Sequence, residues 1–179
     1  MAKDGVSAFY QGWIAKKIVN AVQNSTIAPG RLTLADMKNY QAKELPAVCG
    51  PYREFKVCGM APPSSGGVAV IQILGQLEKF DIAKLSMANA EFAHLFTQSS
   101  RLAFADRNHY IADSSFVSVP TQGLVSKPYM AERAMLINAD KDMGNAQAGT
   151  PQGALAQAED NAFELPSTSH ISIVDQDGK

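Results

Sequence analysis

The sequence lacks several features that would place it quickly in a class of protein. Its formal net charge is −1 over 179 residues, so charge gives no reason to expect nucleic acid or an anionic membrane as a partner. No apolar run approaches the ~20 residues of a membrane-spanning helix. Residues 1–5 contain no apolar core, so no signal peptide is visible. The apolar fraction of 46% is that of a globular domain with a real core.

Common catalytic signatures are also missing. The sequence contains no GxxxxGK[ST], which argues against a nucleotide-binding loop. It contains no G-x-S-x-G, so Ser64 and Ser65 do not form a hydrolase nucleophile elbow. The separation of His94 and His109 does not predict a metal site. We interpret both histidines as surface or packed side chains, and residues 61–67 as a tight turn between a strand and a helix.

What is present predicts an α-rich body with one hairpin, in the α/β class. Hydrophobic periodicity of the helical kind predicts helices over residues 9–24, 66–80, 88–108 and 126–140, and a short helix after Thr33. Thr33 and Asp36 have the spacing of a capping box at the start of that short helix. The serines before Gly66 are expected to cap the helix that follows them.

Two strands are predicted over residues 44–49 and 55–60. With a two-residue turn at Arg53-Glu54, Cys49 lies directly opposite Cys58. Cross-strand pairs without hydrogen bonds approach to ~4.5 Å between α-carbons, near the lower limit for a disulfide. Two interpretations are therefore open: a disulfide, or two small apolar residues in a half-buried hairpin.

The composition changes near the end of the chain. Residues 141–161 are rich in Gly, Ala, Gln, Asn and Asp, so we expect a flexible surface segment that contributes little to a core. Ile171 and Ile173 then alternate with other residues as in a half-buried strand. Residues 177–179 resemble a hairpin turn whose second strand is missing, which predicts that the sequence is a piece of a longer protein.

Thr168 lies at the start of this last strand. If the chain were cut before it, Thr168 would carry both a nucleophilic hydroxyl and a free α-amine that could act as its base. A flexible segment upstream suits such a cut, because the upstream end must move away afterwards. The alternative is an ordinary Ser/Thr-rich edge strand.

Three stretches together resemble the γ-glutamyltranspeptidase family. Phe9-Tyr10-Gln11-Gly12 is similar to a helix start in the later part of the family's large subunit. Met60-Ala61-Pro62-Pro63-Ser64-Ser65-Gly66-Gly67 is similar to its proline-serine-glycine loop. Thr168-Ser169-His170-Ile171-Ser172-Ile173-Val174-Asp175 is similar to the Thr-Thr-His-x-Ser-Val-Val-Asp that opens its small subunit. The resemblance covers nearly the whole sequence, in order.

The resemblance implies an N-terminal-nucleophile hydrolase with a four-layer αββα sandwich, of which this chain supplies a mainly helical body, one hairpin and a lone C-terminal strand. Residues 1–167 would be the C-terminal part of the large subunit, with 141–167 as a flexible linker. Residues 168–179 would start the small subunit. Autocleavage would occur between Ser167 and Thr168, and Thr168 would be the catalytic nucleophile.

The implied substrates are glutathione and other γ-glutamyl compounds, with water, an amino acid or a peptide as acceptor. The implied partners are the remaining parts of both subunits, and neither a metal nor an organic cofactor is needed. The family's location implies a periplasmic or secreted parent protein. Ser169 departs mildly from the family's second threonine. The substrate-binding and oxyanion residues of the family lie outside this sequence, so we expect the isolated chain to be inactive.

Two other functions stay open at this point. One is an amidase like the cephalosporin or glutaryl acylases of the same superfamily, which would differ in its substrate pocket. The other is a non-catalytic helical binding module, in which the Ser/Thr-rich strand is only structural. The unpaired last strand argues against the module.

Overall fold

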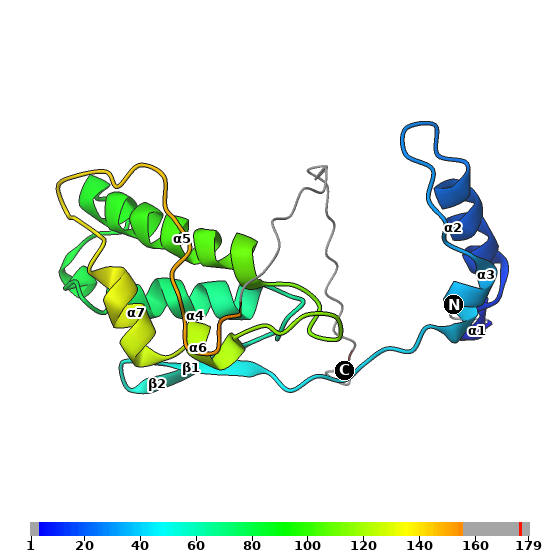
Figure 1. Cartoon of the computed structure of the whole chain (residues 1–179), viewed down its shortest axis with the longest axis horizontal. Coiled ribbons are helices and arrows are strands. Elements are labelled where there is room, and N and C mark those ends of the chain that lie inside the picture. The colour runs from blue at the N-terminus through cyan, green and yellow to red at the C-terminus, as the bar shows by residue number, and fades with distance from the viewer. Residues whose placement is uncertain (1–3, 156–175, 177–179) are drawn as a thin grey trace. The chain divides into compact units, whose positions relative to one another are not determined.

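The computed structural model describes residues 4–155 and residue 176. The chain divides into two compact units, Met1–Leu45 and Pro46–Lys179 (Figure 1). The sequence suggested one ordinary domain; the difference arises because the apolar residues of the first unit pack on one another in a small core of their own. Among the described residues, no helix combines the length and apolar character needed to cross a membrane.

The first unit holds three short helices: α1 (Ser7–Tyr10), α2 (Trp13–Gln23) and α3 (Leu34–Asn39). The single helix expected over residues 9–24 is therefore wrong, because the chain is interrupted at Gly12. A Cβ on Gly12 would lie 2.8 Å from the Cα of Ala8, so the backbone approaches there more closely than a side chain allows. The core of this unit consists of Ala15, Val19 and Met37.

The predicted capping box at the start of α3 is confirmed. The Asp36 N–H donates to Thr33 Oγ1 at 3.1 Å, and the Thr33 N–H donates to Asp36 Oδ2 at 2.8 Å. These reciprocal bonds satisfy two amides that a helix start would leave open. Hydrogen bonds from the Thr33 side chain and backbone lower the pKa of the Asp36 carboxyl.

The second unit is layered around helix α4 (Gly66–Leu77). On one side of α4 lies the hairpin of β1 (Val48–Tyr52) and β2 (Phe55–Gly59), and on the other lies α5 (Ala90–Tyr110) (Figure 1). The remaining elements are a 3₁₀ turn (Ile82–Lys84), α6 (Thr121–Leu124) and α7 (Lys127–Ala134). One core cluster joins α4 to the hairpin, α5 and the chain around α6 and α7, and consists of Val48, Val68, Ile71, Tyr110, Leu124, Val125, Tyr129 and Met130. Leu77, Leu95, Leu102 and Ile137 form a second cluster.

Several predicted boundaries move in the structure. β1 begins at Val48 and continues through Pro51-Tyr52, and α7 ends at Ala134. Helix α5 starts at Ala90 because Asn89 Oδ1 accepts from the Glu91 N–H at 2.8 Å, which is the bond of an N-cap.

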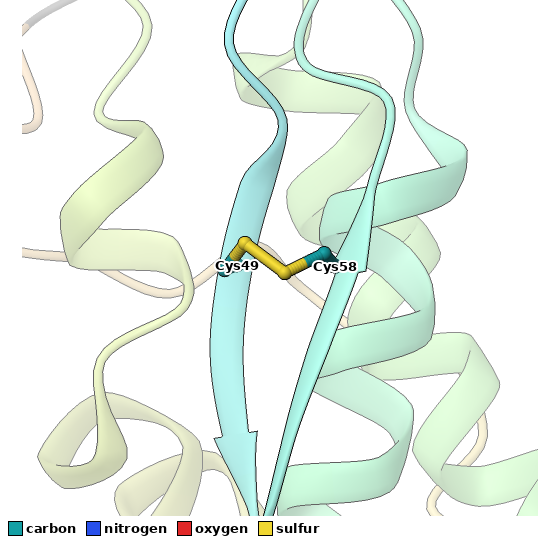
Figure 2. Close-up of a disulfide and its surroundings, with 2 residues drawn as sticks. All are labelled: Cys49 and Cys58. Atoms are coloured by element: carbon teal, nitrogen blue, oxygen red, sulfur yellow. A yellow bond between two sulfur atoms is a disulfide. The ribbon is translucent and has the colours of Figure 1, made fainter.

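The hairpin has the predicted register. Cys49 pairs with Cys58 across a two-residue turn, and their Cα atoms lie 4.1 Å apart. The two sulfurs form a disulfide that joins β1 to β2 (Figure 2). Of the two interpretations that the sequence left open, the structure therefore has the disulfide.

Small residues bring the hairpin close to α4. A Cβ on Gly59 would lie 2.6 Å from Gly67 Cα, and one on Gly50 would lie 2.3 Å from Ile71 Cγ2. The expected tight strand-to-helix turn with close backbone packing is thus confirmed. Because side chains alternate along a strand, Cys49 and Cys58 lie on the opposite, outer face of the hairpin.

Replacing both cysteines with serine is expected to lower the free energy of unfolding by about 2–3 kcal/mol, since a disulfide that closes a short loop restricts the unfolded chain. Urea titrations of the oxidised wild type and the Cys49→Ser/Cys58→Ser variant measure the difference. A reductant should bring the wild type to the level of the variant and leave the variant unchanged. If reductant does not change the urea midpoint of the wild type, the prediction is wrong.

Candidate functional site

The two residues predicted to carry the chemistry, Ser167 and Thr168, lie outside the described residues. The structure does describe part of the chain that leads to them, residues 141–155, and the helices on which that segment lies. A buried carboxylate of the body, Asp106, contacts this segment.

Asp106 of α5 is fully buried and collects donors on both carboxylate oxygens. Its Oδ2 accepts from Gln72 Nε2 at 2.9 Å and from the Tyr129 hydroxyl at 2.8 Å. Its Oδ1 accepts from the Gly149 N–H at 2.9 Å and lies 3.3 Å from Arg133 Nη2. A buried carboxylate needs such a set of donors and a counter-charge. Asp106 thus links α4, α5 and α7 to the segment before Thr168.

Two further groups hold the same stretch of backbone. Arg133 Nη2 donates to the carbonyl oxygen of Gln147 as well as pairing with Asp106. The Tyr110 hydroxyl donates to the carbonyl oxygen of Gly149 at 2.7 Å. Gly149 is thus bound through both its N–H and its carbonyl, one to each of two buried α5 side chains.

Apolar packing continues along the segment. Pro151 is buried, Ala148 and Ala154 pack on the first core cluster, and Met143 and Ala146 on the second. The expectation that this region contributes little to a core is corrected for residues 141–155. The sequence is polar and small-residue-rich there because its backbone groups, rather than large side chains, make many of the contacts.

The two tyrosine hydroxyls near Asp106 have raised pKa values. Burial raises the pKa of the Tyr129 hydroxyl far above its usual range, and the neighbouring Asp106 charge and its hydrogen bond raise it further. Burial, then the Asp106 charge, also raises the pKa of Tyr110. Both hydroxyls donate, one to the carboxylate and one to the segment, and the raised pKa values extend their protonation further into alkaline solution.

The proline-serine-glycine loop is the other feature that the sequence singled out. Ser65 precedes α4, but its side chain makes no capping bond to the helix, which corrects that expectation. Its Oγ instead accepts from Arg107 Nε at 3.5 Å, so the loop is tied to α5. In the ranges that the structure describes, no group of three or more His, Cys, Asp or Glu side chains is placed to hold a metal ion.

The role of Asp106 was not predicted from the sequence. The helix predicted over residues 88–108 gave Asp106 no role, whereas Asp106 is buried and pairs with Arg133 of α7. A signal was available, because Asp106 continues the stripe of Leu95, Ser99 and Leu102 that faces the core at helical spacing. An acidic residue on such a stripe predicts a buried partner.

Known proteins similar in sequence show the family to which this chain belongs. The model of the gamma-glutamyltranspeptidase family matches residues 1–179. The chain belongs to this family. It is 36% identical to the "Glutathione hydrolase proenzyme" of Escherichia coli (strain K12) over 99% of its own length and 29% of that protein. It is 32% identical to the "Acylase ACY 1 proenzyme" of Pseudomonas sp. (strain SE83), again over 99% of this chain and 29% of the other.

A solved structure agrees with the sequence matches. The γ-glutamyltranspeptidase of Helicobacter pylori superposes with a TM-score of 0.69 at 33% identity, covering 87% of this chain and 44% of that one. The chain thus has the helix-rich fold of part of an N-terminal-nucleophile hydrolase. It spans about three tenths of the length of the curated relatives that it matches. Membership of this enzyme family does not favour the alternative of a non-catalytic binding module.

Proposed function

We propose that this γ-glutamyltranspeptidase chain is part of a precursor that cleaves itself between Ser167 and Thr168 and then breaks the γ-glutamyl amide bond of glutathione and similar compounds. The observation that carries the proposal is the family match over residues 1–179, which includes the Ser167-Thr168 pair. The proenzyme names of the relatives support a precursor form.

The proposed cleavage uses only groups of the chain and water. The Thr168 hydroxyl attacks the carbonyl carbon of Ser167, the C–N bond breaks, and the hydroxyl proton passes to the released amine. Water then hydrolyses the resulting ester to give the Ser167 carboxylate and a free Thr168 hydroxyl. In turnover, the same hydroxyl takes the γ-glutamyl group and passes it to water, an amino acid or a peptide.

We further propose that residues 1–167 end the large subunit and that residues 168–179 begin the small subunit. The complete αββα sandwich would then form only with the remainder of both subunits. A periplasmic or secreted location is part of the proposal. The Cys49–Cys58 disulfide supports it, because structural disulfides persist in oxidising compartments.

Mass spectrometry of the full-length precursor tests the proposal. We expect incubation to yield a new N-terminus at Thr168, followed by release of glutamate from glutathione. The isolated 179-residue chain should give neither the fragment 168–179 nor turnover, because an oxyanion donor alone is worth about 2.7–4 kcal/mol of barrier and the family's donors lie outside this sequence. Cleavage elsewhere in the precursor would refute the assignment of Thr168.

A parallel assay with a glutaryl amide separates the proposed activity from its main alternative. The relative named as an acylase is 32% identical to this chain, as is the glutathione hydrolase proenzyme of Bacillus subtilis. If the processed enzyme releases glutarate from the glutaryl amide faster than glutamate from glutathione, the proposed activity is wrong. The enzyme is then an acylase-like amidase. Processing at Thr168 is common to both outcomes, so the substrate assay decides between them.

A further inference from the structure

Asp106, Tyr110 and Arg133, here called the Asp106 cluster, bind the backbone of the segment that leads to Thr168, which suggests a role beyond stability. Three of the bonds in and around it end on the backbone of residues 147 and 149: Gly149 N–H to Asp106, Gly149 carbonyl from Tyr110, and Gln147 carbonyl from Arg133. All three partner side chains are buried. Residues 147–149 are therefore a fixed point on the body, and residues 150–166 separate this point from Ser167.

We propose that Asp106 is a positioning residue for autocleavage: with Tyr110 and Arg133, it anchors residues 147–149 so that the segment entering the Ser167–Thr168 bond starts from a fixed place. This rests on the proposed function. Asp106 does not touch the scissile bond. It acts through the Gly149 backbone, by fixing where residues 147–149 lie on the body.

The anchor fixes a short stretch of chain that lies between other attachments. Met143 and Ala146 pack on the second core cluster before it, and Pro151 is buried after it. Loss of the three bonds therefore does not free a long segment, but it lets the backbone at residues 147–149 shift. Misplacement of reacting groups by 1 Å can slow a reaction by about a hundredfold. We expect loss of the anchor to slow cleavage by at least about threefold.

The same geometry implies that the anchor matters less after the cut. Turnover requires the free Thr168 amine and hydroxyl, which the cleaved enzyme carries on the small subunit. The anchored residues then belong to the end of the large subunit, whose last residues no longer have to reach a scissile bond. A positioning role thus predicts a defect in processing without an equal defect in turnover, which a purely structural role does not.

The test uses the full-length precursor and two variants. Asp106→Asn removes the charge and replaces one of the two acceptor oxygens with an NH2 donor, and Tyr110→Phe removes only the hydroxyl that binds Gly149. Ser99→Ala is the matched control: Ser99 is equally buried in the α4–α5 interface, and its hydroxyl donates to Gln76 and the Ile73 carbonyl of α4, not to residues 141–155. The first-order rate of appearance of the Thr168 N-terminus is measured for each.

Both anchor variants should process at least about threefold more slowly than Ser99→Ala. The amide of Gly149 should exchange hydrogen faster in Asp106→Asn, which reports release of the anchor directly. When the two subunits are expressed as separate chains, so that no cleavage is needed, kcat should match the wild type. If Asp106→Asn fails to fold, Tyr110→Phe alone decides the outcome.

Three results would overturn the inference. They are wild-type processing in both anchor variants, equal slowing in Ser99→Ala, or an equal loss of kcat in the separately expressed enzyme. Failure of the proposed function is distinct from these, since a wild-type precursor that never yields a Thr168 N-terminus refutes Thr168 itself rather than Asp106.

Discussion

Replacing Thr168 with alanine in the full-length precursor is expected to abolish the new N-terminus and to lower glutathione turnover by about 10⁴- to 10⁶-fold, as removal of a catalytic nucleophile does elsewhere. In the proposed mechanism, the variant lacks the hydroxyl oxygen that attacks the Ser167 carbonyl in processing and the γ-glutamyl carbonyl in turnover. Mass spectrometry and a glutamate-release assay measure the two effects separately.

Two neighbouring changes define what Thr168 contributes. Thr168→Ser keeps a hydroxyl and should still process, whereas Ser169→Ala removes only the adjacent hydroxyl and should retain both activities. Expressing the small subunit from residue 168 as a separate chain bypasses cleavage; there, Thr168→Ala should remain inactive because the nucleophile itself is missing. Normal processing of Thr168→Ala, or inactivity of Ser169→Ala with an active Thr168→Ala, would assign the nucleophile elsewhere.

Local signals in the sequence predicted local structure well. The capping box of Thr33 and Asp36 depends on residues three apart, and the Cys49–Cys58 register depends only on a two-residue turn. Both appear in the structure as predicted, because the determining atoms are close in the sequence. The break at Gly12 was missed because periodicity reports which residues face the core and not how closely two backbones approach.

Long-range signals were harder to recognise. Asp106 lies on the core-facing stripe of α5, but α5 alone does not show its counter-charge, because Arg133 is supplied by α7. The segment after residue 140 looks like a linker because its contacts come from backbone groups such as Gly149 N–H and carbonyl. Composition describes side chains, so it cannot show that a glycine is held by two buried partners.

The buried Asp106 and the bound segment around Gly149 depend on each other. The segment needs a buried acceptor because its Gly149 N–H is inside the body, and Asp106 needs donors because a buried charge is costly without them. Each feature therefore explains the other. In the family's proposed processing scheme, they connect the core of the large subunit to the chain that leads to Thr168.

Replacing Arg133 measures how much its pair with Asp106 contributes to the free energy of unfolding. Arg133→Met should lower the free energy of unfolding of the second unit by about 3–5 kcal/mol, because it leaves the buried Asp106 carboxylate without a counter-charge. The only tryptophan, Trp13, lies in the first unit, so its fluorescence would not report the change. Urea unfolding followed by hydrogen exchange of α5 amides reports on the correct unit.

Arg101→Met is the matched control for Arg133→Met. Arg101 also lies on a helix and pairs with Asp142, but that pair is exposed, with 40% and 61% of the side chains accessible against 6% and 0% for Arg133 and Asp106. An exposed pair is worth about 0–1 kcal/mol. If Arg101→Met lowers the free energy of unfolding as much as Arg133→Met does, burial is not what makes the Asp106 pair strong.

Combining Asp106→Asn with Arg133→Met should lower the free energy of unfolding by less than the sum of the two single changes. The difference should be about 0.5–3 kcal/mol, because each single change leaves a buried partner unpaired and the double variant no longer contains that partner.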